Sequence, residues 1–150
     1  MRIYLDACAL NRLTDDQSQP RIHAEAEAVE RIFHLIWKRK IEWSASTPLA
    51  AELHRNPNTG KRQDAMALLS YAGPLISPEP NALKRAELLE AAGYGAFHAL
   101  HLAGAEAAKV DALVTTDDRF IKQAARGLGN PTVRVLNPLD WLQEVRSWLP

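Results

Sequence analysis

The sequence predicts an α/β fold in which one parallel sheet is covered by helices on both faces. Short apolar segments alternate along the chain with longer segments whose apolar residues recur every three or four positions, the spacing of one helix face. Parallel neighbouring strands need right-handed crossovers, so this alternation places helices on both sides of the sheet. The 150 residues, 47% of them hydrophobic and 24% charged, are enough for a single domain, residues 1–150, with a buried core.

Five short segments are the predicted strands. The first covers residues 3–5, where Ile-Tyr-Leu begins almost at the start of the chain and stops at Asp6, as a central buried strand does. Residues 41–45 alternate in polarity and form the second. The third is the shortest, two apolar residues between Pro74 and Pro78. This third strand is expected at residues 75–76. The fourth and fifth are expected at residues 112–116 and 132–136.

The longest predicted helix runs from Pro20 to about Lys40. Its apolar residues, from Ile22 to Ile36, recur at spacings of four, three, four and three, and a proline suits the first turn. Thr47 is expected to cap a helix over residues 49–55, and Asn81 to cap one over residues 82–92. Further helices are expected at residues 7–13 (a short helix or turn), 61–71, 97–109, 118–125 and from 138 onward.

Charge and cysteine content limit the classes of protein. Lys plus Arg and Asp plus Glu both number 18, so any nucleic-acid binding depends on a local patch rather than on overall charge. Cys8 is the one cysteine, so no internal disulfide forms, and no zinc-type Cys/His spacing is present. We see no signal peptide and no apolar stretch near the roughly 18 residues that cross a bilayer. A soluble protein of the reducing cytoplasm, with no membrane association, is expected.

Three carboxylates stand close to the ends of predicted strands. Asp6 follows the first strand, Glu52 lies little more than one turn into the helix after the second, and Asp117 follows the fourth. Ligands of open α/β sheets bind beyond the carboxyl ends of the strands, so these side chains are expected in one acidic pocket. Mg²⁺ prefers such oxygen ligands, and it can activate water and neutralise a phosphodiester. The alternative is a helix cap or surface charge, with Thr116 or Asp117 capping residues 118–125.

Four blocks of sequence together resemble the PIN domain family. They are Ile-Tyr-Leu-Asp ending at Asp6, Glu-Leu-His-Arg-Asn-Pro from Glu52, Ala-Leu-His-Leu-Ala at 99–103 with Glu106, and Thr-Thr-Asp-Asp-Arg-Phe at 115–120. The likeness extends from Arg2 to about Leu142. It implies a Rossmann-like three-layer fold with a central parallel five-stranded sheet.

The same resemblance implies an activity and partners. Family members are Mg²⁺- or Mn²⁺-dependent endoribonucleases, and many small ones are toxins of toxin–antitoxin pairs. An RNA substrate, an antitoxin protein and a homodimer are therefore expected. By position, Asp6, Glu52 and Asp117 match three of the family's acidic residues, as catalytic residues and metal ligands, and Asp118 matches a neighbouring carboxylate.

One position departs from the family pattern. An aspartate usually stands directly before the Ala-Leu-His-Leu-Ala block, whereas this chain has His98. Neutral histidine binds Mn²⁺ and later transition metals better than Mg²⁺, so weakened activity is expected. A joint His98–His101 metal site is an alternative, although His101 belongs to the block and is expected to be structural. The predicted metal ligands are Asp6, Glu52, Asp117, Asp118 and His98.

RNA binding requires cations near the acidic pocket. Six occupy predicted loops or helix starts, where they would contact phosphates rather than bases, and ordinary surface charge is the alternative. They are Arg12, Arg55, Lys61, Arg62, Arg119 and Lys122.

Two other functional classes remain open. Phosphoryl-transfer enzymes of the haloacid dehalogenase class carry a second aspartate two residues after the first, where this chain has Cys8. The stronger alternative is a catalytically inactive PIN-like module that binds RNA or a protein.

Four tryptophans favour the expected homodimer, because they exceed what one small sheet obviously needs and aromatic residues are enriched in interface cores. Burial of all four in the core is the alternative. They are Trp37, Trp43, Trp141 and Trp148.

Overall fold

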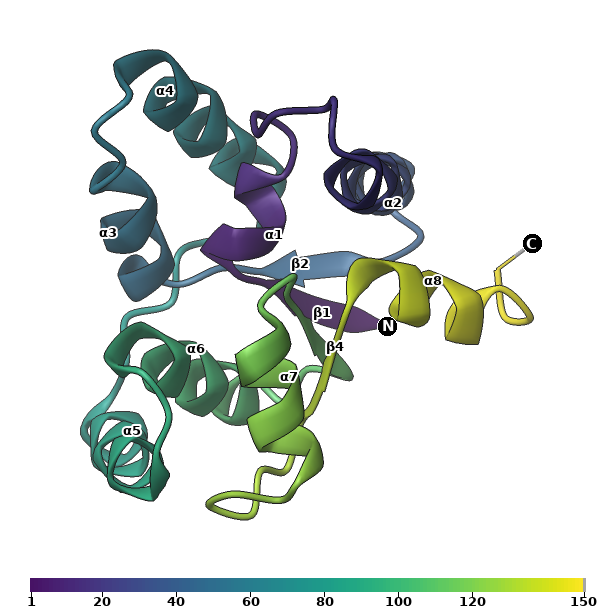
Figure 1. The fold of residues 1–150 in the computed structure, drawn as a ribbon. Helices are drawn as coiled ribbons and strands as arrows, with labels where there is room; N and C mark the ends of the chain where they lie inside the picture. The colour runs from purple at the N-terminus through teal and green to yellow at the C-terminus, as the bar shows by residue number, and fades with distance from the viewer. Residues whose placement is uncertain (150) are drawn as a thin grey trace.

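The computed structural model describes residues 1–149 and contains a four-stranded parallel sheet with helices on both sides (Figure 1). The strand order is β2-β1-β3-β4. Each pairing is parallel, and Tyr4 of the central strand β1 lies opposite Ser44 on one side and Leu113 on the other. The predicted α/β class with a parallel sheet is confirmed. The strands are β1 (Arg2–Leu5), β2 (Glu42–Ser44), β3 (Ala112–Val114) and β4 (Arg134–Leu136).

The predicted five-stranded sheet is not confirmed. Ile76, from the predicted third strand, forms only an isolated parallel bridge with Ser46 beside the end of β2. Proline has no amide hydrogen to donate to a ladder, and Pro74 and Pro78 flank this segment closely. The pairing therefore stops at a single bridge.

Helices cover both faces of the sheet. Figure 1 shows α1 to α4 on one side and α5 to α7 on the other, while α8 packs against α2. α2 ends at Trp37, earlier than predicted, because Arg39 turns the chain with a left-handed φ of 56°. The helices are α1 (Ala7–Asn11), α2 (Pro20–Trp37), α3 (Thr47–His54), α4 (Thr59–Leu68), the 3₁₀ turn η1 (Leu69–Tyr71), α5 (Pro80–Ala92), α6 (Ala96–Ala107), α7 (Asp118–Ala125) and α8 (Pro138–Val145).

Two predicted helix caps, Thr47 and Asn81, are wrong. Thr47 is not the cap of α3, because it already lies within the helix and the extended residue Ser46 accepts the N–H of Leu49 at 3.3 Å. Asn81 does not cap α5, which begins one residue earlier at Pro80. The last helix, expected from residue 138 onward, does begin at Pro138, and the side chain of Asn137 caps it.

The connections create a switch point between β1 and β3. From β1 the chain passes through α1 and α2 to β2 on one side, and from β3 it passes through α7 to β4 on the other. The two halves diverge at these adjacent strands, and in such sheets this leaves a crevice beyond the strands' carboxyl ends. Asp6 follows β1 and Thr115 follows β3, so both lie at this crevice.

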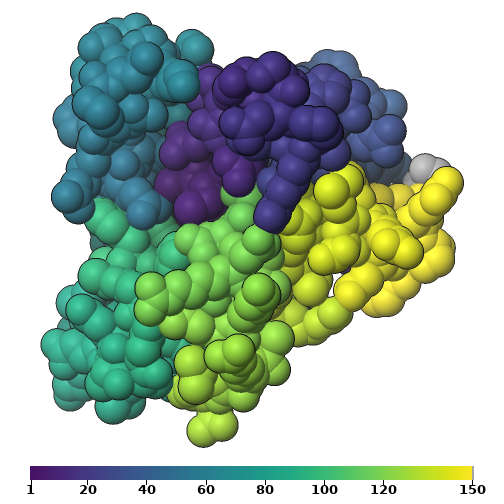
Figure 2. Space-filling view, viewed as in Figure 1, coloured from purple at the N-terminus to yellow at the C-terminus, as the bar shows by residue number. Residues whose placement is uncertain are grey.

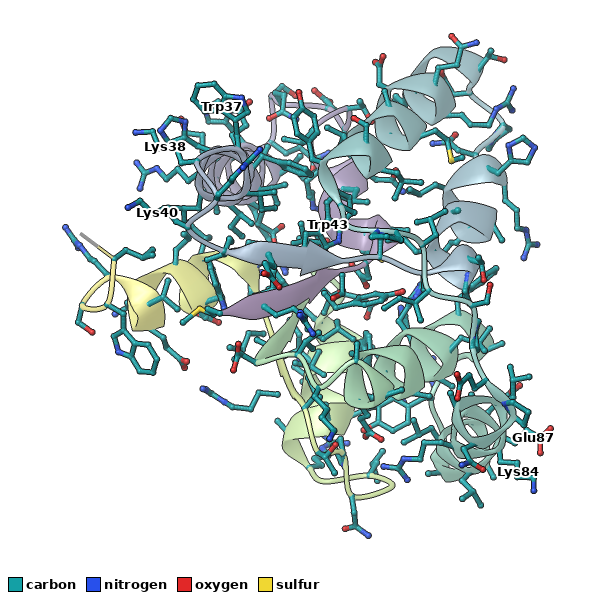
Figure 3. All side chains as sticks on the ribbon, turned by 180° about the vertical axis from the view of Figure 1, so that it is seen from behind. Trp37, Lys38, Lys40, Trp43, Lys84 and Glu87 are labelled. Carbon is teal, nitrogen blue, oxygen red and sulfur yellow. The ribbon has the colours of Figure 1, made fainter. Side chains whose placement is uncertain are left out.

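The tryptophans divide evenly between core and surface. Trp43 and Trp141 are each 2% exposed, whereas Trp37 is 67% and Trp148 is 74% exposed. Figure 3 shows Trp37 projecting away from the end of α2 near Lys38 and Lys40, with Trp43 close to the sheet. Core burial therefore accounts for two of the four.

The part of the chain described by the structure, residues 1–149, has no helix with both the length and the apolar character needed to cross a lipid bilayer.

Candidate functional site

Asp6 is a buried carboxylate at the carboxyl end of the central strand. It is 1% exposed and caps α1, with Oδ1 accepting the N–H of Ala9 at 3.0 Å. Oδ2 accepts the hydroxyl of Thr115 at 2.6 Å. Burial raises the pKa of Asp6 above its usual value, an effect that His101 and the Thr115 hydrogen bond partly oppose. A bound cation would favour the ionised carboxylate at this place.

Asp117 both caps a helix and faces the crevice. Its Oδ1 accepts the N–H of Phe120 at 3.0 Å at the start of α7, so the capping interpretation is correct. Its Oδ2 lies 3.6 Å from Nε2 of His98. The N–H of Asp117 also donates to Oγ1 of Thr115 at 3.1 Å, and that hydroxyl in turn donates to Asp6. One threonine therefore connects the carboxylate of Asp6 to the backbone of Asp117.

His98 lies in the first turn of α6 and points into the same crevice. Its ring stacks on Phe120 with centroids 4.3 Å apart and planes 12° apart, which orients the imidazole. Asp6, Cys8 and His98 each present one ligand atom, and these three atoms lie within 4.8 Å of one another. The structure thus places His98, the residue found where the family pattern has an aspartate, next to Asp6.

Cys8 lies among the predicted carboxylates, and the sequence analysis did not identify it as a site residue. Burial raises the pKa of its thiol, and the negative charges of Asp6, Glu52 and Asp117 raise it further. Of the predicted ligands, Asp6 and His98 lie within 4.8 Å of this cysteine's sulfur through their ligand atoms. The sequence did contain a signal, because Cys8 lies two residues past Asp6 in the segment that directly follows a buried strand, which the structure shows to be helix α1.

Glu52 belongs to a chain of hydrogen bonds that runs through His101 and Tyr4 to Ser46. Its Oε1 lies 2.9 Å from Nε2 of His101, whose Nδ1 lies 2.7 Å from the hydroxyl of Tyr4. The Tyr4 hydroxyl lies 2.6 Å from Oγ of Ser46. Both ring nitrogens of His101 are thus engaged in hydrogen bonds, with Tyr4 and with Glu52. The structure therefore does not show a joint His98–His101 metal site.

Asp118 lines the same pocket as Asp117, but its carboxylate is engaged in an ion pair. Both of its oxygens accept hydrogen bonds from the guanidinium of Arg21 on α2, at 2.6 and 2.8 Å. The hydrogen bonds from Arg21 hold the pKa of Asp118 below its usual value. This carboxylate is committed to an exposed ion pair, in contrast to Asp117.

The predicted RNA-binding cations occupy different settings. Arg12 lies at the crevice, where it pairs with Asp15 at 2.8 Å and with the buried Glu25 at 3.2 Å. Arg55 places its guanidinium 5.5 Å from the ring centroid of Phe97. The others are Lys61 and Arg62, half-buried on α4, and Arg119 and Lys122, exposed on α7. Of these six cations, Arg12 lines the described pocket that contains Asp117.

That pocket has a volume of about 450 Å³ and opens between α1 and the start of α7. In Figure 2 the purple N-terminal segment reaches the surface between the blue-teal α3–α4 region and the light green α7. Oδ1 of Asn11, on the pocket wall, is buried without a hydrogen-bond partner among residues 1–149. The pocket is lined by Cys8, Asn11, Arg12, Asp15, Thr116, Asp117 and Asp118.

The donor set at the crevice fits a divalent cation. Carboxylate oxygens, an imidazole nitrogen and a thiol sulfur meet beside an unsatisfied amide oxygen, and each is a known type of metal ligand. The fold and site together define an α/β protein with an acidic, histidine- and cysteine-containing crevice at its switch point.

Comparisons with protein families, with curated proteins and with solved structures gave no match.

Proposed function

We propose that the protein is a divalent-metal-dependent endoribonuclease of the PIN type, acting as the toxin of a toxin–antitoxin pair. The observation that carries this proposal is the meeting of Asp6, Asp117 and His98 at the crevice, with Thr115 linking the two aspartates. Ligands of doubly wound sheets bind at this place in the fold, which supports a catalytic rather than a purely structural role.

The chain's own residues have distinct roles in this proposal. A bound Mg²⁺ or Mn²⁺ supplies an activated water and neutralises charge on the phosphodiester. Asp6, Asp117 and His98 would hold the ion. Glu52, with one oxygen kept in place by His101, has its other oxygen available to accept a proton from water. Arg12 at the pocket wall is placed to contact a phosphate, although it must share its charge with Asp15 and Glu25.

RNA cleavage tests the proposal directly. Purified protein is incubated with a labelled structured RNA in Mg²⁺, in Mn²⁺ and in chelator, beside the variants Asp6→Asn and Asp64→Asn. Asp64 is exposed on α4 and serves as the matched control. We expect metal-dependent cleavage by the wild type and by Asp64→Asn, and none by Asp6→Asn. Equal cleavage by all three proteins, or cleavage in chelator, would contradict the proposal.

The proposed partners are an antitoxin and a second copy of the chain, in the cytoplasm. Trp37 and Trp148 support a protein partner, because large aromatic side chains are enriched in interface cores and these two are exposed. Light scattering at micromolar protein concentration measures the mass of the particle. A monomer would count against the homodimer and leave the exposed tryptophans for the antitoxin.

A second candidate is a PIN-like module that binds RNA or a protein without cleaving RNA. His98 favours it, because an imidazole replaces the carboxylate expected at this place and is a poorer ligand for Mg²⁺. RNA retained in a filter-binding assay, without cleavage in either metal, would support this candidate over the nuclease.

A further inference from the structure

We infer that the crevice binds a borderline transition-metal ion of the Zn²⁺ class, through Asp6, Cys8 and His98, in preference to Mg²⁺. This inference rests on the metal dependence in the proposed function, and it does not require RNA cleavage. It assigns a ligand role to the only cysteine of the chain.

The geometry needs only a small adjustment. The three ligand atoms lie within 4.8 Å of one another. Zn–S bonds of about 2.3 Å and Zn–N or Zn–O bonds of about 2.0–2.2 Å separate two tetrahedral ligands by roughly 3.5 Å. Side-chain movements on the order of 1 Å, within the reach of small χ adjustments, would therefore complete the site.

The chemistry of the three donors selects the class of ion. Mg²⁺ takes oxygen ligands in near-ideal octahedral geometry, and of these three donors only Asp6 offers oxygen. A thiolate favours Zn²⁺ and other soft or borderline ions, and imidazole suits Zn²⁺, Cu²⁺, Fe²⁺ and Ni²⁺. With Cys8 and His98 supplying sulfur and nitrogen, two of the three ligands disfavour Mg²⁺.

The surroundings hold two of the ligands in place before any ion binds. Hydrogen bonds from Ala9 and Thr115 fix both oxygens of Asp6. Stacking on Phe120 fixes the ring of His98. Such supporting contacts orient ligands and strengthen metal binding. Cys8 is anchored by its position in α1, two residues after Asp6.

Two further oxygen atoms lie near the three ligands. Oδ2 of Asp117 lies 3.6 Å from Nε2 of His98 and outside the three-residue cluster, and Oδ1 of Asn11 on the adjoining pocket wall has no partner within residues 1–149. Catalytic zinc sites have three protein ligands and leave the fourth position to water, whereas structural sites are closed by four. A site held by Asp6, Cys8 and His98 alone would belong to the open kind.

Cobalt substitution tests the inference without any activity assay. Chelator-treated protein is titrated with Co²⁺ alone while the near-ultraviolet and visible absorption is recorded. Since Cys8 is the single cysteine, a thiolate-to-cobalt charge-transfer band can come only from this residue. We expect the band in the wild type, its removal by equimolar Zn²⁺, and its persistence in a large excess of Mg²⁺.

Two variants and one protection assay complete the test. Cys8→Ser should lose the band. In both Cys8→Ser and His98→Ala, the affinity for Co²⁺ should fall by at least the roughly 10–100-fold known for the loss of supporting contacts. In wild-type protein, Zn²⁺ should slow alkylation of Cys8, which stays informative if a variant does not fold. Co²⁺ binding without the band, alkylation unaffected by Zn²⁺, or displacement of Co²⁺ by equimolar Mg²⁺ would overturn the inference.

Failure of the inference and failure of the proposed function can be told apart. Mg²⁺-dependent RNA cleavage without a charge-transfer band refutes the Cys8 site and retains the nuclease. A charge-transfer band without RNA cleavage in any metal retains the Cys8 site and refutes the nuclease.

Discussion

The hydroxyl of Thr115 donates a 2.6 Å hydrogen bond to Oδ2 of Asp6, joining the carboxyl ends of the two central strands. The two residues are far apart in sequence, and the same hydroxyl oxygen accepts the N–H of Asp117. This bond therefore sets the relative position of both aspartates at the switch point.

Replacing Asp6 with asparagine should abolish metal binding without destabilising the metal-free protein. Because burial raises the pKa of Asp6 in the folded state, its contribution to stability is fully present below the unfolded value of about 3.9 and is lost as pH rises through the folded pKa. Each unit by which the pKa is raised costs about 1.4 kcal/mol of stability at neutral pH.

Urea denaturation in chelator at pH 4 and pH 7 measures this effect. At pH 7 the free energy of unfolding of Asp6→Asn should equal or exceed that of the wild type, and the difference should shrink toward pH 4. A variant less stable than wild type at pH 7 by more than about 1 kcal/mol, the typical net value of one lost hydrogen bond, would contradict the assigned pKa direction.

Thr115→Val should destabilise the protein more than Thr116→Val. Both threonines are buried neighbours, but the hydroxyl of Thr115 bonds to Asp6 and Asp117. Leaving a buried group without its partner costs about 1–3 kcal/mol. Chemical denaturation of the two isosteric variants gives the comparison, and equal losses of stability would show that the Thr115 bonds contribute little.

Asp117→Asn should weaken Mn²⁺ binding, whereas Asp118→Asn should not. Asparagine retains an oxygen for the cap on Phe120, so Asp117→Asn should fold normally while losing about tenfold or more in Mn²⁺ affinity, equivalent to about 1.4 kcal/mol. Asp118→Asn only removes the exposed pair with Arg21 and should leave affinity unchanged. Calorimetric titration with Mn²⁺ tests both, and an equal loss in the two variants would make Asp118 a ligand.

His98→Asp should shift the metal preference toward Mg²⁺ and raise RNA cleavage. An added carboxylate near the ion contributes on the order of 1–3 kcal/mol net, comparable with a charged hydrogen bond and equal to about a ten- to hundredfold tighter Mg²⁺ affinity. His98→Ala, which loses the same stacking on Phe120 without adding charge, is the control. If both variants bind Mg²⁺ alike, the residue at this position does not face the ion.

Tyr4→Phe should destabilise the protein by about 1–3 kcal/mol, because it leaves His101 and Ser46 without their shared buried partner. Tyr71→Phe removes an exposed hydroxyl and is the control. Thermal or urea denaturation measures both. A loss no greater than that of Tyr71→Phe would mean that water replaces the hydroxyl in the network.

Local sequence was sufficient for much of the fold and for part of the site. The apolar run before Asp6 and the run before Thr115 were assigned to strands, because a buried parallel strand has a local pattern of its own. Placing Asp6 and Asp117 at one sheet edge followed from the topology of alternating strands and helices. The family and the function remain predictions from the same residues.

Tertiary packing settled what no local pattern contains. The third strand reduced to one bridge at Ile76, and which tryptophans are buried depended on the helices packed over them. Arg21 pairs with Asp118, 97 residues away, and Cys8 meets His98 across a similar separation. Hydrophobic periodicity and helix caps act over a few residues, whereas these contacts form only when the sheet brings distant strand ends together.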